Sequence, residues 1–154
     1  MIHRLVEHAT IVVERVYDVS VERVFAAWSD PEAKARWFHS ADGEFELDFR
    51  VGGWERGHGP LPDGREYAFE AQYRDIVPDR RIVYTYDMFV DGTRISVSVA
   101  TAEFAPEGDA TRLVFTEQAA FLDGHEPPAR REQGWGSLLD SLEQWLERSR
   151  SDGG

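Results

Sequence analysis

Hydrophobic and polar residues alternate with a period of two through the middle of the chain, which is the pattern of half-buried β-strands. Tyr67, Phe69, Ala71 and Tyr73 share one face of such a run, and Glu70 lies on the other. Turn residues of the Pro, Gly and Asp type separate the runs. No helical pattern occurs between the runs from Phe45 to Phe121, so neighbouring strands there are expected to be antiparallel. The predicted strands are Thr10–Tyr17, Phe45–Phe49 continuing through Trp54–His58, Glu66–Val77, Arg81–Val90, Arg94–Phe104 and Thr111–Phe121.

Helical spacing of apolar residues occurs in two places. Between the first two strands, Ser20 is placed to cap a short helix ending near Trp28, and Asp30-Pro31 begins a second short helix that ends near Trp37. After Pro127-Pro128, a stripe at helical spacing predicts a C-terminal helix of about 18 residues. The stripe consists of Trp135, Leu138, Leu139, Leu142, Trp145 and Leu146.

One apolar sheet face and one apolar helix stripe together make a two-layer core, which indicates the α+β class. The length of 154 residues favours one domain, predicted over residues 1–148, with a flexible tail over 149–154. The chain has no Cys, so it has neither disulfides nor thiolate metal sites. Its five His residues show no paired ligand spacing, and the sequence predicts no metal and no cofactor.

The formal net charge is −12, and no basic tail offsets it. DNA phosphates and anionic lipid surfaces repel such a protein, so nucleic acid and membranes are poor candidate partners. No apolar run reaches the roughly 18 residues of a membrane span. The first residues carry charges where a signal peptide needs an apolar stretch, so a cytoplasmic location is expected.

Several short motifs occur in an order that is typical of one family. They are Arg15 at the end of the first strand, Trp28-Ser-Asp-Pro-Glu32 with Trp37, Arg50-Val-Gly-Gly53, Asp63-Gly64, Gly108-Asp-Ala-Thr-Arg-Leu113, and Gly134-Trp135 before Leu139-Asp140. From about Thr10 to Trp145, the chain resembles the family named for homology to the activator of the heat-shock-protein-90 ATPase. That family lies within the START, polyketide-cyclase and birch-pollen-allergen superfamily. Val51 replaces the proline usual in the family's Arg-Pro-Gly-Gly turn.

The resemblance implies a helix-grip fold, in which a curved antiparallel sheet wraps around the long C-terminal helix. It also implies a deep cavity between sheet and helix that accepts apolar or amphipathic small molecules. The sequence suits such a cavity, because the expected concave face carries large aromatic side chains with polar tips. Arg131 lies one turn before Trp135, where it could meet an anionic head group. The candidate ligand-binding residues are Trp37, Trp54, Phe69, Tyr84, Tyr86, Met88, Phe115, Arg131, Trp135 and Leu138.

Three functions remain open at this stage. The leading one is non-catalytic binding of a small hydrophobic or amphipathic molecule, such as a lipid. The second is a pocket enzyme of the polyketide cyclase or hydrolase type, for which an inward-facing strand carboxylate would be needed among Glu70, Asp87, Glu103 and Glu117. The third is a co-chaperone that stimulates a heat-shock-protein-90 ATPase.

Two structural alternatives are also open. Either face of the Arg94–Phe104 strand could line the cavity, although the resemblance turns Ala102 and Phe104 inward. A homodimer could form through an exposed sheet edge or an outer patch around Ile95 and Val97.

Overall fold

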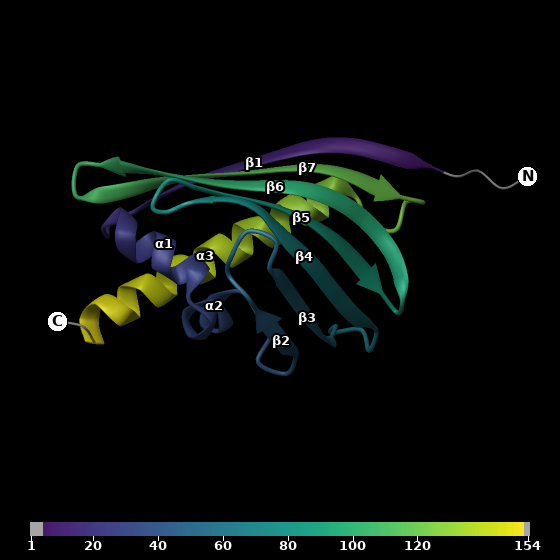
Figure 1. Ribbon diagram of the computed structural model, residues 1–154. Helices are drawn as coiled ribbons and strands as arrows, with labels where there is room; N and C mark the ends of the chain where they lie inside the picture. The colour runs from purple at the N-terminus through teal and green to yellow at the C-terminus, as the bar shows by residue number, and fades with distance from the viewer. Residues whose placement is uncertain (1–4, 153–154) are drawn as a thin grey trace, which may run out of the picture.

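A seven-stranded antiparallel sheet forms the framework of the protein in a computed structural model that describes residues 5–152 (Figure 1). The strand order across the sheet is β1-β7-β6-β5-β4-β3-β2, so β1 and β2 are its two edges. Each strand from β3 to β7 pairs with its neighbour in the chain. The strands are β1 (Val6–Tyr17), β2 (Glu44–Leu47), β3 (Trp54–Pro60), β4 (Glu66–Val77), β5 (Arg81–Val90), β6 (Thr93–Glu107) and β7 (Ala110–Leu122).

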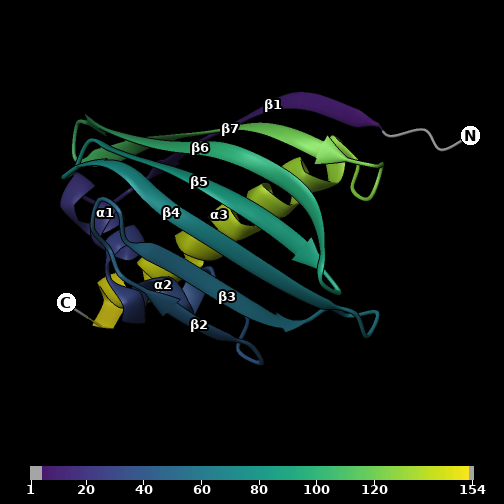
Figure 2. The ribbon, with the colours of Figure 1, turned by 45° about the vertical axis from the view of Figure 1, so that its right-hand side comes forward.

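Three helices cover the concave face of this sheet: α1 (Val21–Ser29), α2 (Pro31–Trp37) and α3 (Pro128–Asp152). The long helix α3 crosses beneath the strands, and α1 and α2 lie beside its C-terminal half (Figures 1 and 2). The predicted α+β class and helix-grip arrangement are confirmed. Within the described residues, no helix combines the length and the apolar character needed to cross a bilayer.

The C-terminal helix is longer than the sequence predicted. It has 25 residues and continues to Asp152, so residues 149–152, which were expected in a flexible tail, are helical. Residues 153 and 154 of that tail lie outside the described residues. The Ser149 hydroxyl accepts a hydrogen bond from the Arg23 guanidinium at 2.9 Å, which ties this end of α3 to α1.

The run that was read as continuous from Phe45 to His58 is two strands, and that prediction was wrong. β2 ends at Leu47 and folds back against β3, with Glu44 opposite His58. Glycines make the reversal possible, because Gly52 has a φ of 86°, which side chains disfavour. A Cβ at Gly53 would overlap the carbonyl oxygen of Asp48. Alternation alone did not reveal this turn.

A β-bulge decides which side of β6 faces the helices. The register between β5 and β6 shifts after Met88, so that Met88 pairs with Ser96 while Phe89 pairs with Arg94. Ile95 has no partner in this ladder and is only 5% exposed, so it cannot contribute to the outer patch that was considered for a dimer. Beyond the bulge, small residues face inward, while Val97 and Val99 face solvent. The inward residues are Ser96, Ser98, Ala100 and Ala102.

The core consists of aromatic rings between sheet and helices. Trp135 of α3 stacks on Phe115 of β7, with ring centroids 3.8 Å apart, and lies parallel to Trp28 of α1 at 6.3 Å. Leu139, Leu142 and Leu146 continue the buried stripe of α3, each at most 2% exposed. Burying side chains of this size stabilises the fold by roughly 1.5–3 kcal/mol each.

Candidate functional site

The aromatic packing stops short of one end of the sheet and leaves a cavity of about 640 Å³. Its walls come from β4, β5, the start of β6 and the N-terminal half of α3. Phe38, just after α2, forms part of the inner end. The volume lies in the range typical of small-molecule sites. The apolar lining residues are Phe38, Leu61, Tyr67, Phe69, Tyr86, Met88, Val90, Ile95, Trp135 and Leu138.

Six of the ten residues singled out from the sequence line this cavity: Phe69, Tyr86, Met88, Arg131, Trp135 and Leu138. They come together because inward positions of β4 and β5 face the stripe of α3. The register places Phe69 opposite Met88.

The other four candidates lie elsewhere. Trp54 points to the outer face of the sheet, where it is 38% exposed and its ring lies 4.5 Å from the Arg56 guanidinium. Trp37, Tyr84 and Phe115 face inward but are part of the solid core, each at most 3% exposed. The sequence shows which face of each strand is buried. It does not show at which positions along the strand the inward side chains pack against the core and at which they border a cavity.

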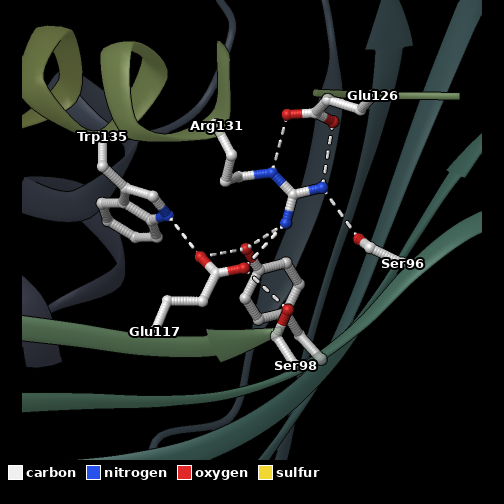
Figure 3. A network of polar contacts seen from close by, with 7 residues as sticks. Ser96, Ser98, Glu117, Glu126, Arg131 and Trp135 are labelled. Carbon is white, nitrogen blue, oxygen red and sulfur yellow. Dashed lines mark hydrogen bonds and ion pairs between the residues drawn. The ribbon is translucent and has the colours of Figure 1, made fainter. Parts of the chain in front are cut away.

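A buried polar network supports one wall of the cavity (Figure 3). At its centre is Glu117 of β7, whose side chain is 0% exposed. Its carboxylate accepts four hydrogen bonds, from the Tyr86 hydroxyl and the Ser98 hydroxyl at 2.7 Å and from Arg131 and the Trp135 indole at 2.8 Å. These four donors occupy all four lone-pair positions of the two carboxylate oxygens.

Arg131 completes the network from α3. Its Nε and one Nη group donate to the two oxygens of Glu126, at 2.9 and 3.0 Å. The remaining N–H groups reach the hydroxyls of Tyr86 and Ser96 and the Glu117 carboxylate, each at 2.8 Å. These contacts use all five N–H donors of the guanidinium. Arg131 therefore borders the cavity, as expected, but has no free donor for the head group of a ligand.

The network keeps Arg131 charged and Tyr86 neutral. Burial by itself lowers the pKa of Arg131, but Tyr86 and the carboxylates of Glu126 and Glu117 outweigh it and raise the pKa above its ordinary value. Burial and the adjacent Glu117 carboxylate raise the pKa of Tyr86, so its hydroxyl stays protonated. The network therefore holds the rings of Tyr86 and Trp135 in fixed positions at the cavity wall.

A second buried polar cluster lies next to Phe38. The Lys34 ammonium contacts Glu55 at 2.7 Å, and the His39 imidazole contacts the other oxygen of the same carboxylate at 2.7 Å. The Tyr73 hydroxyl donates to Glu55 as well. Burial by itself raises the pKa of Glu55, but Lys34 and His39 outweigh it and lower the pKa to about 2.

This second cluster positions the inner end of the cavity. The Lys34 ammonium lies 4.5 Å from the centre of the Phe38 ring, a cation–π contact with a residue that lines the cavity. Lys34 belongs to α2 and Glu55 to β3, so the ion pair joins this helix to the sheet.

Sequence reasoning missed both clusters, although signals for parts of them existed. Glu117 continues the alternation of Leu113, Phe115, Ala119 and Phe121, which indicates an inward position. Lys34 is the only lysine in the chain, but it occupies a helix position where its charge favoured a surface assignment. Among residues 5–152, no three His, Asp or Glu side chains lie close enough together to hold a metal ion.

Charged side chains gather at the outer part of the cavity. Arg65, Asp91, His125 and Arg130 all line it. Arg65 is paired with Asp63 at 2.7 Å. The exposed Arg130 guanidinium, in contrast, forms no ion pair with any residue that the structure describes.

Comparison with known proteins agrees with this architecture. The family model described as "Activator of Hsp90 ATPase homolog 1-like protein" matches residues 18–147. The chain belongs to this family. The match confirms the family resemblance drawn from the sequence motifs. No functionally curated protein matches the chain.

Several solved structures share this fold. An uncharacterised protein of Rhizobium leguminosarum is 47% identical, with 96% of this chain and 99% of that one covered and a TM-score of 0.91. A protein of Rhizobium loti is 44% identical, covering 92% and 99% with a TM-score of 0.87. A protein of the dynemicin biosynthetic locus is 19% identical, covers 90% of this chain and 47% of that one, and has a TM-score of 0.68. This last similarity concerns the fold alone.

Proposed function

We propose that the protein binds a small hydrophobic or amphipathic molecule in the cavity between the sheet and α3. The observation that carries the proposal is the cavity itself, about 640 Å³ in volume with a largely aromatic and aliphatic lining. A ligand in the cavity would transfer its apolar surface from water to contact with aromatic rings. Each buried CH₂ group would contribute about 0.8 kcal/mol to the free energy of binding. The residues proposed to contact it are Phe69, Tyr86, Met88, Trp135 and Leu138.

The two buried networks support a binding role because they make the cavity rigid before a ligand arrives. Glu117 and Arg131 fix Tyr86 and Trp135, and Lys34 packs against Phe38. A preformed wall reduces the conformational entropy lost on binding. At the inner wall, Glu117, Arg131 and Tyr86 are already paired with one another, which favours recognition by shape and desolvation over catalysis by Glu117.

The distribution of charge favours an amphipathic ligand with its polar end outward. Apolar residues form the inner walls, and Arg130, Arg65 and His125 lie in the outer part. Because Arg130 has no carboxylate partner in the described structure, it is the best placed cation for a carboxylate or other anionic head group. It takes the role that the sequence assigned to Arg131.

Native mass spectrometry of the purified protein tests this function. We expect either a retained small molecule or, after its removal, binding of one molecule per chain from a panel of fatty acids and aromatic compounds. The same compounds should raise the melting temperature, because a ligand that binds only the folded state stabilises it. Absence of both a retained molecule and any thermal shift would contradict the proposal.

A further inference from the structure

Strand β1 presents a long backbone edge that no other helix or strand of the described chain covers, although the Arg15 guanidinium donates to one of its carbonyls, that of Glu14, at 3.0 Å. It runs for 12 residues at one end of the sheet order and pairs on one side only, with β7. Figures 1 and 2 show no helix or loop beside its outer edge. Such an edge is a template for pairing with another strand.

The register with β7 shows which residues of β1 point to that edge. The Asp123 N–H donates to the Leu5 carbonyl at 2.7 Å, and these two residues continue the pairing of Val6 with Leu122. Leu5 and Asp123 are therefore a hydrogen-bonded pair, and the odd-numbered residues of β1 bond to β7. The N–H and C=O groups of the even-numbered residues, from Val6 to Val16, turn to the free edge.

The sequence of β1 is complementary to itself when two copies run antiparallel with Ile11 opposite Ile11. In this register Glu7 of one copy faces Arg15 of the other, and His8 faces Glu14. Glu7 and Glu14 thus each face a side chain that can donate a hydrogen bond to the carboxylate. Sliding the strands by two residues either way places these charged groups opposite apolar or hydroxyl side chains, so charge selects this register.

The same register is consistent with the faces of the strand. Odd-numbered residues from Ala9 to Tyr17 face the helices, and even-numbered residues face outward, so each pair joins residues on the same side of the sheet. On the outer side Val6 meets Val16, which are 50% and 46% exposed, and Val12 meets Thr10. Pairing therefore covers valines that are exposed in the isolated chain.

We propose that β1 pairs with β1 of a second copy of this chain, forming a two-fold symmetric dimer centred on Ile11 with one continuous sheet. This inference is independent of the ligand and specifies the interface of the homodimer that the sequence left open. The Arg15 guanidinium, which contacts the Glu14 carbonyl and Asp140 in the isolated chain, exchanges the Glu14 carbonyl for Glu7 of the second copy, and the released carbonyl accepts the His8 N–H of that copy.

Two charge-reversed variants test the register. The dimer contains two equivalent contacts between residue 7 of one copy and residue 15 of the other. Both become Arg opposite Arg in a dimer of Glu7→Arg, and both become Glu opposite Glu in a dimer of Arg15→Glu. Each variant alone should dissociate at least about tenfold more readily than the wild type in sedimentation velocity at low salt. A one-to-one mixture restores both opposite-charge pairs, so it should form a heterodimer of near wild-type affinity.

Thr10→Pro tests the edge without removing an internal hydrogen bond. The Thr10 N–H points to the free edge, so proline there leaves the pairing with β7 intact and blocks pairing with a second copy. We expect a folded monomer, with wild-type circular dichroism. The proposal is overturned if the wild type is a monomer at 100 μM or more, if its dimer survives Thr10→Pro, if the mixture fails to associate, or if β1 pairs only with an extended segment of a different protein.

Discussion

Arg131 on α3 and Glu117 on β7 are joined at 2.8 Å with both side chains almost fully excluded from solvent, at 7% and 0% exposed. This contact makes the C-terminal helix and the sheet one unit beside the cavity. A buried ion pair is stabilising only when its remaining donors and acceptors are satisfied, and here Tyr86, Ser96, Ser98, Trp135 and Glu126 satisfy them.

Changing both members of this pair should therefore cost less than the sum of the two single changes, because each single change leaves the other group without its partner. We expect Arg131→Met to lower the free energy of unfolding by about 3–5 kcal/mol, because it leaves the Glu117 charge buried. Combining it with Glu117→Gln should cost clearly less than the sum of the two single changes. Urea denaturation of the four proteins measures this coupling. Additive effects would show that the two residues do not act together.

The Glu55 carboxyl predicts how stability depends on pH. Its pKa falls from an ordinary value of 4.5 to about 2 in the folded protein, so the unfolded chain binds a proton more readily between these values. Its contribution is complete above about pH 4.5 and is lost as the pH falls toward 2. The contribution is about 3 kcal/mol by linkage.

We expect Glu55→Gln to flatten the fall in unfolding free energy between about pH 4.5 and 2. Denaturant melts at several pH values compare this variant with Glu46→Gln, an exposed glutamate on the adjacent strand β2. A slope as steep in Glu55→Gln as in the wild type would contradict the assignment.

Arg130 should select for an anionic end on the ligand. We expect Arg130→Gln to weaken binding of a fatty acid threefold or more at low salt, and to leave binding of the corresponding alcohol unchanged. Arg148→Gln is the matched control, because Arg148 is an exposed arginine on the same helix that does not line the cavity. Calorimetric titration measures all of these affinities. If Arg130→Gln lost the same binding affinity for the fatty acid and for the alcohol, Arg130 would not be the residue that binds the anionic head group.

Local signals in the sequence predicted much of the fold. Asp30-Pro31 marked the break between α1 and α2, and β4 and β5 have the predicted bounds. These boundaries depend on capping and turn residues, whose conformational preferences act over a few positions. The bulge at Ile95 and the reversal at Gly52-Gly53 depend on pairing between strands, so periodicity along one strand could not locate them.

The candidate site was predicted less completely for a related reason. Whether an inward side chain such as Phe115 or Met88 meets a neighbour or an empty space depends on where α3 crosses the sheet. Phe115 lies under Trp135, whereas Met88 lies beyond that contact and borders the cavity. The four partners of Glu117 come from three separate segments, β5, β6 and α3, and only the folded structure brings them together.

Gly134 offers the most direct test of the central claim that the cavity accepts a guest. It lines the cavity on α3, and a Cβ added there meets no atom within 4 Å. Gly134→Phe should therefore fill part of the cavity, while Gly134→Ala, the matched control, adds one methyl group and increases helix propensity by about 1 kcal/mol. The measurement is fluorescence titration with 1-anilinonaphthalene-8-sulfonate, an aromatic anion. We predict saturable binding at one site per chain in the wild type and in Gly134→Ala, and a loss of tenfold or more in affinity in Gly134→Phe. Equal binding by all three proteins, or none by the wild type, would contradict the account.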